Sequence, residues 1–543
     1  MQSTMMDVPL TTAAIMRHGS TVHATATVRT LQPDGSVKVG TFAEVGRRAA
    51  QLAHALKARG VLADQRVATL MWNNQEHVEA YCAVPSMGAV LHTLNPRLTA
   101  EQLIYVGNHA EDEVLIVDGS LVPLLLPVLP QLSTVHTIVV TGGVDLDELH
   151  RDGVLVVGYE DFLASQPDTF EWPEIEERSA AAMCYTSGTT GNPKGVAYSH
   201  RSTYLHSMAA CAADGLCVTS EDRILAIVPM FHANAWGLIY AAFMAGADLL
   251  MPERFLQAEP LVRLIDAEKP TIAGAVPTIW SDVLNYLEEN PGFDVSSLGL
   301  VACGGSAVPL HLMQIFEHKY GVHIVQAWGM TETSPLAAIA RPPAAANDED
   351  KWLLRATQGR PVAGVELRLV DDDGNVLPHD GEAVGELQVR GAWITGAYVG
   401  EEEDEEKFDR GWLRTGDVGR IDARSFVTLT DRSKDVIKSG GEWISSVEIE
   451  LLLAGHPDVL EASVIAIPDE KWQERPLAVV VVRDGRSVSP EQLRDFLAGK
   501  VARWWLPERW AFVAEVPKTS VGKFDKKELR RNHADGQLSV VEI

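Results

Sequence analysis

Residues 185–195 (YTSGTTGNPKG) are the segment whose composition points most directly to chemistry. Backbone N–H groups of a glycine-rich loop and the hydroxyl groups of serine and threonine can surround phosphate oxygens, and Lys194 adds a positive charge. An apolar run at residues 180–185, typical of a buried strand, leads into the segment. Pro193 before the lysine and Gly195 after it depart from the P-loop pattern. We therefore predict a phosphate-binding loop of another kind rather than a flexible surface loop.

Shorter segments further along the chain have residue types that could complete such a site. The glycines at 304–305 would let a flat base lie against the backbone, because glycine has no side chain. Thr331 and Glu332 offer hydroxyl and carboxylate oxygens, the hard ligands that Mg²⁺ prefers. Lys523 stands in a glycine-containing loop just before a helix that Asp525 would cap. Taken singly, each segment has an ordinary interpretation as a tight turn or an exposed charge.

Parallel strands joined by crossover helices are the scaffold that we expect to hold these loops. From about residue 40 to 300, short apolar runs rich in β-forming residues alternate with longer helical patterns. Thr99 and Gln102 have capping-box spacing before a helix that runs to Asn108, and residues 114–118 then resemble a buried strand. The pattern predicts an α/β fold.

A change of pattern near residue 360 indicates further domains. Residues 365–370 and 385–390 alternate in polarity, as antiparallel strands do, and we interpret the acidic run at 401–406 as a solvated surface loop. Beyond it, a Ser445 cap precedes a short helix, and residues 462–467 are typical of a strand. We predict an N-terminal domain over residues 1–431, with a β subdomain at about 355–431, and a small C-terminal α+β domain over residues 432–543.

Composition argues against several classes of protein. The chain has 543 residues, 74 of them acidic and 46 basic, and its net charge of −28 opposes nucleic-acid binding or attachment to anionic membranes as a main function. The cysteines lack the spacing of a zinc site or a disulfide framework and are interpreted as reduced thiols. No window approaches the roughly 18 consecutive apolar residues of a membrane-spanning helix. We expect a cytoplasmic protein with no stable membrane insertion.

In its motifs the chain resembles the adenylate-forming superfamily, which includes acyl-CoA synthetases, peptide-synthetase adenylation domains and luciferases. The phosphate loop matches that superfamily's signature, and further blocks follow in the same order across most of the chain. These blocks are residues 229–237 (PMFHANAWG), 304–307 (GGSA), 328–333 (WGMTET), 415–417 (TGD), 431–435 (DRSKD) and 517–523 (PKTSVGK).

The resemblance implies a reaction in two steps. A carboxylate attacks the α-phosphorus of ATP to give an acyl-adenylate and pyrophosphate, and the thiol of CoA then displaces AMP. Several negative charges meet in the first step, so Mg²⁺ and cationic side chains are needed. The resemblance gives the catalytic set as Lys523, Glu332 and Thr186, the last two also as metal ligands. The residues that it implies for ATP and AMP binding are Thr186, Ser187, Gly188, Thr189, Thr190, Gly191, Lys194, Gly304, Gly305, Ser306, Ala327, Trp328, Gly329, Met330, Thr331, Glu332, Asp417, Arg432 and Lys523.

Closer similarity to long- and medium-chain fatty acyl-CoA synthetases lies in residues 92–98 (HTLNPRL), 231–236 (FHANAW) and 438–446 (KSGGEWISS). It implies that Trp236 gates an acyl tunnel, that Lys434 is the hinge of a mobile C-terminal domain, and that the large domain has two flavodoxin-like lobes. A homodimer is also implied. The acyl-pocket residues would be His232, Trp236, Val276 and Gly304, and the CoA-binding residues Lys438, Gly440, Gly441, Glu442 and Trp443.

Two alternatives to a fatty acid–CoA ligase stay open at this point. A ligase for short, aryl or methylthio-propionate-type acids would share every nucleotide motif and differ only in the acyl pocket. A nucleotide-binding relative without CoA chemistry should have lost the glycines at 440–441 or Lys523, and this chain has both.

Overall fold

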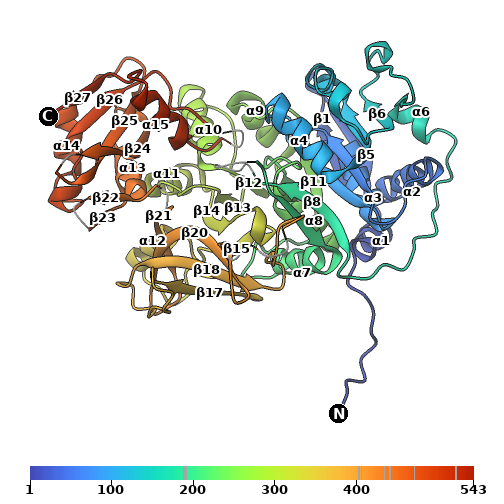
Figure 1. The fold of residues 1–543 in the computed structure, drawn as a ribbon, viewed down its shortest axis with the longest axis horizontal. Helices are drawn as coiled ribbons and strands as arrows, with labels where there is room; N and C mark the ends of the chain where they lie inside the picture. The colour runs from blue at the N-terminus through green and yellow to red at the C-terminus, as the bar shows by residue number, and fades with distance from the viewer. Residues whose placement is uncertain are drawn as a thin grey trace.

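Among the residues that the structure describes, two large sheets with flanking helices form the body of the molecule, and a smaller antiparallel sheet and a C-terminal α+β part adjoin it (Figure 1). The computed structural model describes residues 1–186, 192–401, 404, 406–432, 435–439, 442–469, 471–519 and 522–543, without the side chains of Glu442 and Trp443. The first residues form an extended arm that leads into α1 (Thr12–Val22). No helix in these described ranges is long and apolar enough to cross a membrane.

The first sheet is parallel except at one edge, where β8 pairs antiparallel with β9. Helix α4 (Ala100–Ala110) begins with the predicted capping box, in which Thr99 and Gln102 exchange hydrogen bonds. The predicted strand that follows it is β5. In spatial order the strands are β7 (Leu155–Gly158), β6 (Thr137–Thr141), β5 (Asp112–Asp118), β3 (Arg66–Leu70), β4 (Val90–Thr93), β8 (Ala180–Tyr185) and β9 (Gly195–Ser199).

The second sheet is parallel at its centre and antiparallel at both edges. One hydrophobic cluster contains residues of both large sheets and of α2 (Phe42–Ala58) and α8 (Leu238–Ala245), where Phe42 and Phe243 stack with ring centroids 4.0 Å apart. The two lobes therefore share a core. The strands in order are β16 (Arg360–Pro361), β15 (Leu336–Ile339), β14 (Ile324–Gly329), β13 (Leu300–Gly304), β12 (Ile272–Ala275), β10 (Arg223–Leu225), β11 (Asp248–Met251), β1 (Thr27–Leu31) and β2 (Val37–Thr41).

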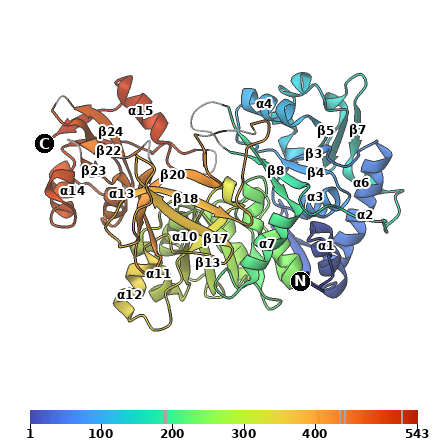
Figure 2. The same cartoon turned by 60° about the horizontal axis from the view of Figure 1, so that its bottom comes forward.

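The smaller antiparallel sheet lies across the junction between the body and the C-terminal part (Figure 2). Its first strand spans the predicted residues, and the second runs one residue beyond the prediction, so this antiparallel region is confirmed. The strands are β17 (Val365–Val370), β18 (Gly385–Gly391), β19 (Phe408–Asp409), β20 (Trp412–Ile421) and β21 (Val427–Arg432).

The C-terminal part packs helices on a mixed sheet. Ser445 caps α13 (Ser446–Ala454) and Asp525 caps α15 (Lys526–Ala534), each by accepting the backbone N–H of the residue three positions on, as predicted. The predicted strand at 462–467 is longer than expected. The remaining helix is α14 (Pro490–Leu497), and the strands are β22 (Ile437–Ser439), β23 (Glu442–Ile444), β24 (Val459–Asp469), β25 (Gln473–Val482), β26 (Arg509–Phe512) and β27 (Val540–Glu542). The α/β fold class is confirmed.

Candidate active site

A cavity of about 270 Å³ opens where the carboxyl ends of strands from both large sheets converge. In open α/β sheets, ligands bind at this end of the strands, because the loops that follow the strands meet there. Thr186 follows β8, Val276 follows β12, and Glu332 follows β14. The predicted site residues that line this cavity are Thr186, Lys194, His232, Trp236, Val276, Gly304, Gly305, Ala327, Trp328, Gly329, Met330, Thr331, Glu332, Arg432 and Lys523.

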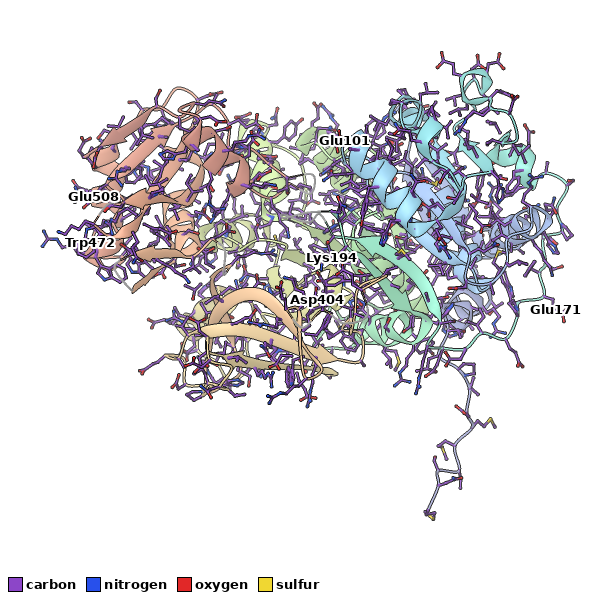
Figure 3. The ribbon with its side chains drawn as sticks, in the orientation of Figure 1. Glu101, Glu171, Lys194, Asp404, Trp472 and Glu508 are labelled. Carbon is purple, nitrogen blue, oxygen red and sulfur yellow. The ribbon has the colours of Figure 1, made fainter. Side chains whose placement is uncertain are left out.

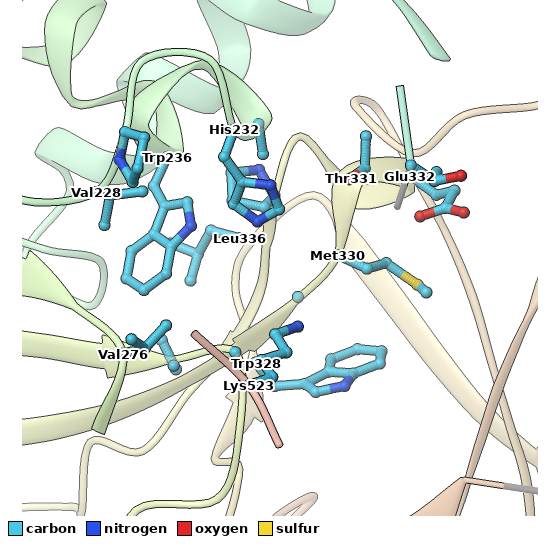
Figure 4. Close-up of a pocket in the computed structure, with 18 of the residues that line it drawn as sticks. Val228, His232, Trp236, Val276, Trp328, Met330, Thr331, Glu332, Leu336 and Lys523 are labelled. Carbon is cyan, nitrogen blue, oxygen red and sulfur yellow. The ribbon is translucent and has the colours of Figure 1, made fainter. Parts of the chain in front are cut away.

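Lys523 enters this cavity from the C-terminal part of the chain. In Figure 4 its side chain lies between Trp236 and Val276 on one side and Glu332 on the other. The hydroxyl of Thr278 donates to the backbone oxygen of Gly522 at 3.3 Å, which holds the loop of Lys523 against the body. Burial, together with the positive charge of Arg432, lowers the pKa of Lys523 to about 8, although Asp417 and Glu332 act in the opposite direction.

Glu332 is buried at the far side of the cavity, in the short helical turn after β14. Tyr398 donates its O–H to Glu332 Oε1 at 2.7 Å, and the backbone N–H of Thr395 donates to the Glu332 carbonyl at 2.8 Å. Among the described residues there is no cluster of three or more His, Cys, Asp or Glu side chains that could hold a metal by itself. The Glu332 carboxylate and the Thr186 hydroxyl line the same cavity, and such a pair fits Mg²⁺, which is commonly held by one or two protein oxygens together with substrate phosphates.

Next to this cavity, a cleft of about 620 Å³ continues between the body and the C-terminal part. The carboxylate of Asp417 lies in the cleft and contacts two side chains. Trp328 Nε1 donates to its Oδ2 at 2.8 Å, and Arg432 Nε lies 3.2 Å from its Oδ1. The carboxylate is therefore fixed by an indole and a guanidinium. The predicted nucleotide-binding residues that line the cleft are Gly305, Ser306, Ala327, Trp328, Gly329, Asp417, Arg432 and Lys523.

Two residues of the acidic run contact Lys194 of the predicted phosphate loop, while Glu401 and Glu406 are exposed, as expected for a surface loop. Lys194 Nζ lies 2.9 Å from Asp404 Oδ2 (Figure 3) and 2.6 Å from Glu401 Oε2. It also stands over the ring of Tyr398. These carboxylates raise the pKa of Lys194, although partial burial opposes them. The lysine, which lines the cavity, is thus charged and already paired with acidic residues.

On the apolar side of the cavity, residues 233–237, here called the Trp236 turn, have left-handed backbone conformations throughout, with φ between 41° and 73°. Such conformations cost non-glycine residues about 1 kcal/mol or more each, so contacts must stabilise them. Asn234 Oδ1 accepts hydrogen bonds from Cys184 Sγ at 3.0 Å and from the hydroxyl of Tyr81 at 3.3 Å. The turn is held in place by the strand that leads into the phosphate loop.

The indole of Trp236 lines the cavity and in Figure 4 lies close to Leu336 and above Val276. A Cβ on Gly304 would lie 2.6 Å from the carbonyl oxygen of Ala327 and 3.6 Å from Trp236, so glycine is required there for the strands and the indole to approach. His232, also in the lining, is half-buried; desolvation and the charges of Lys523 and Arg97 lower its pKa to about 3, so it is neutral. This side of the cavity is suited to an uncharged chain.

Several predicted site residues are not placed in either cavity. Lys438 is exposed, lines neither cavity, and donates its backbone N–H to Glu474. Glu442 and Trp443 are described only as backbone of β23. The predicted residues outside the described ranges are Ser187, Gly188, Thr189, Thr190, Gly191, Lys434, Gly440 and Gly441.

Sequence reasoning missed Tyr398, which lines the cavity and contacts both Glu332 and Lys194. No spacing or composition marks this tyrosine, because its partners lie 66 residues or more away in the chain. Glu401 and Asp404 were recognised only as part of a charged run.

Comparison with known proteins gives a consistent result over the whole chain. The protein-family model described as "AMP-binding enzyme" matches residues 18–399. A second family model, described as "AMP-binding enzyme C-terminal domain", matches residues 448–523. The chain is 43% identical to a 3-methylmercaptopropionyl-CoA ligase of Ruegeria pomeroyi, over 98% of both chains. It is 44% identical to a long-chain-fatty-acid–CoA ligase of Thermus thermophilus, over 98% of this chain and 97% of that protein. The crystal structure of the anthranilate CoA ligase AuaEII with anthranoyl-AMP superposes with a TM-score of 0.88 at 29% identity, over 98% of this chain and 99% of that one.

Proposed function

Because the chain belongs to the AMP-binding enzyme family and is an AMP-forming acid–thiol ligase, we propose that it is an ATP-dependent fatty acid–CoA ligase. It forms an acyl-adenylate and pyrophosphate first, and acyl-CoA and AMP second. One observation carries the proposal: a single cavity has Glu332 at its polar end and Trp236, Val276 and other apolar side chains at the opposite end, with Lys523 between them.

The polar end suits the first step. Lys523 would contact the carboxylate of the acid and an α-phosphate oxygen together, which would reduce the repulsion between two anions. Thr186 and Glu332 would hold Mg²⁺, which would neutralise phosphate charge. Asp417, fixed by Trp328 and Arg432, would accept ribose hydroxyls. Catalysis then rests on positioning and charge neutralisation, without a covalent enzyme intermediate.

A second candidate substrate class follows from one relative. The 3-methylmercaptopropionyl-CoA ligase is about as similar to this chain as the fatty-acid ligase is, and a methylthio chain is as apolar as a short acyl chain. Val228, Val276 and Leu336 would contact either chain. The nucleotide chemistry would be the same for both acids.

Pyrophosphate release across a panel of acids tests the proposal. Straight-chain acids from butyrate to palmitate, 3-methylthiopropionate and benzoate are each supplied with ATP and Mg²⁺, with and without CoA. We expect release with fatty acids, and AMP and thioester only when CoA is present. If no acid supports pyrophosphate release, or if no thioester forms in the presence of CoA, the proposed function is wrong.

Trp236→Ala should change the choice of acid and leave ATP binding intact. The indole fills space next to Gly274 and Gly304, so removing it lengthens the apolar end of the cavity. We expect the ratio of kcat/KM between long and short acids to rise about tenfold or more, a range typical of pocket-size effects, while the KM for ATP stays within about twofold. Trp172→Ala, which truncates an indole away from both cavities, is the control. An unchanged acid profile in a folded Trp236→Ala variant would leave the gate role without support.

Adenylation should lose activity as pH rises through about 8. Lys523 contacts anions only when protonated, and its pKa in the substrate-free protein is about 8, so kcat/KM for pyrophosphate exchange should fall above that pH. ATP would stabilise the charged lysine and move the decline in kcat to higher pH. Lys523→Arg keeps a charge at all these pH values and should lack the decline. The same midpoint in Lys523→Arg would assign the decline to another group.

Further features belong to this proposal as inferences from the resemblance. They are a domain boundary near residue 431, a hinge at Lys434, CoA contacts from residues 438–443, a homodimer and a cytoplasmic location. The position of Lys523 inside the cavity supports an orientation of the C-terminal part that serves adenylation. Size-exclusion chromatography with light scattering would test the homodimer.

A further inference from the structure

The Trp236 turn ends against a buried histidine of α7 (His200–Cys211). His206 is 2% exposed, and a Cβ built on Gly237 would lie 2.6 Å from its Nδ1. Gly237 also has a φ of 73°, so both the backbone conformation and the closeness of the ring exclude a side chain there. The imidazole ring therefore limits how far the end of the turn can move toward α7.

The other nitrogen of the same ring contacts Leu336, on a different wall of the cavity. The backbone N–H of Leu336 donates to His206 Nε2 at 3.2 Å, and the Leu336 carbonyl accepts from Trp393 Nε1 at 2.9 Å. The ring of Trp393 packs edge-on against that of His206, with centroids 5.9 Å apart. Two buried side chains thus hold the backbone of Leu336, whose own side chain lines the cavity (Figure 4).

The protonation state of His206 follows from these contacts. Because Nε2 accepts a backbone N–H, that nitrogen carries no proton. Burial lowers the pKa of His206 to about 4, so the ring is neutral near pH 7 and its proton is on Nδ1, the nitrogen that faces Gly237. The ring is a fixed hydrogen-bond acceptor for Leu336 and a fixed steric stop for Gly237.

We infer that His206 is a positioning residue that sets the distance between the Trp236 turn and Leu336, and that this distance determines which carboxylic acids the cavity accepts. The inference rests on the proposed fatty acid–CoA ligase function. His206 acts through the two walls that it contacts. A short acid fills little of the cavity and depends on both walls for its orientation, whereas a long acid makes many further contacts.

The test compares His206→Leu and His206→Asn with His206→Gln. Leucine has no acceptor, and asparagine is too short to reach Leu336, whereas the glutamine amide can place an oxygen where Nε2 lies. We expect the leucine and asparagine variants to lower kcat/KM for butyrate about tenfold more than kcat/KM for octanoate, because small shifts of a pocket wall cost activity steeply. The KM for ATP should change less than about twofold. His206→Gln should restore the wild-type ratio between the acids.

His200→Gln is the matched control, since His200 is a buried neutral histidine of the same helix whose Nδ1 pairs with Thr12 away from the cavity. It should leave the ratio between the acids unchanged. The inference is overturned if neither His206→Leu nor His206→Asn alters that ratio, or if the KM for ATP rises as much as the KM for butyrate. If either His206→Leu or His206→Asn fails to fold, the ratio between the acids measured for the other variant tests the inference. Absence of pyrophosphate release from the wild type with any acid would instead refute the proposed function.

Discussion

Lys523→Ala should lose most adenylation and still make thioester from supplied acyl-adenylate and CoA. The ammonium of Lys523 is the cation that the C-terminal part inserts between Trp236 and Glu332, so its loss leaves two anions close together with less compensation. Removing one such electrostatic contact typically costs on the order of 10²–10³ in rate. The second step begins from an adenylate that is already formed and has no need of this contact.

Separate assays of the two steps give the measurement. Pyrophosphate exchange reports adenylation, and thioester formation from synthetic acyl-adenylate reports the second step. Lys500→Ala is the control, because Lys500 is an exposed lysine of the same C-terminal part. Equal loss of both steps in a folded Lys523→Ala variant would contradict a role confined to adenylation, and with it the proposed reorientation of the C-terminal part near Lys434.

Local sequence patterns predicted much of the fold for a physical reason. Alternating polarity over residues 365–370 and the caps at Ser445 and Asp525 depend on neighbours within a few positions, and the structure has strands and helices there. The phosphate loop stays a prediction, made because glycines and hydroxyl residues in one short segment can together surround phosphate oxygens.

Contacts between distant segments could not be predicted in this way. Lys194 and Glu401 are 207 residues apart, yet they form an ion pair, because the strand before the phosphate loop and the segment after β18 meet at one cavity. The local sequence also does not predict the left-handed conformations of the Trp236 turn, because only Asn234 and Gly237 are residue types that adopt them readily. Tertiary contacts with Cys184 and His206 stabilise that turn, and no local pattern encodes such partners.

Glu332→Gln should reduce the adenylation rate about 10²–10³-fold and raise the Mg²⁺ concentration needed for half-maximal rate. The substitution is close to isosteric. Glutamine can still accept the hydrogen bond from Tyr398, and the Thr395 contact is made to the backbone, so the turn should keep its structure. What is lost is the negative charge that would bind the metal.

Tyr398→Phe separates this charge effect from simple loss of a hydrogen bond. It removes the donor to Glu332 Oε1 and leaves the carboxylate charged, so we expect a loss of roughly tenfold, in line with one hydrogen bond to a charged group, and little change in the Mg²⁺ requirement. A Mg²⁺ titration of pyrophosphate exchange for both variants decides between the two effects. Near-normal turnover of Glu332→Gln with an unaltered Mg²⁺ requirement would show that the metal is held elsewhere. A larger loss in Tyr398→Phe than in Glu332→Gln would instead make the tyrosine, through its contacts with Lys194 and Glu332 together, the more important group at this end of the cavity.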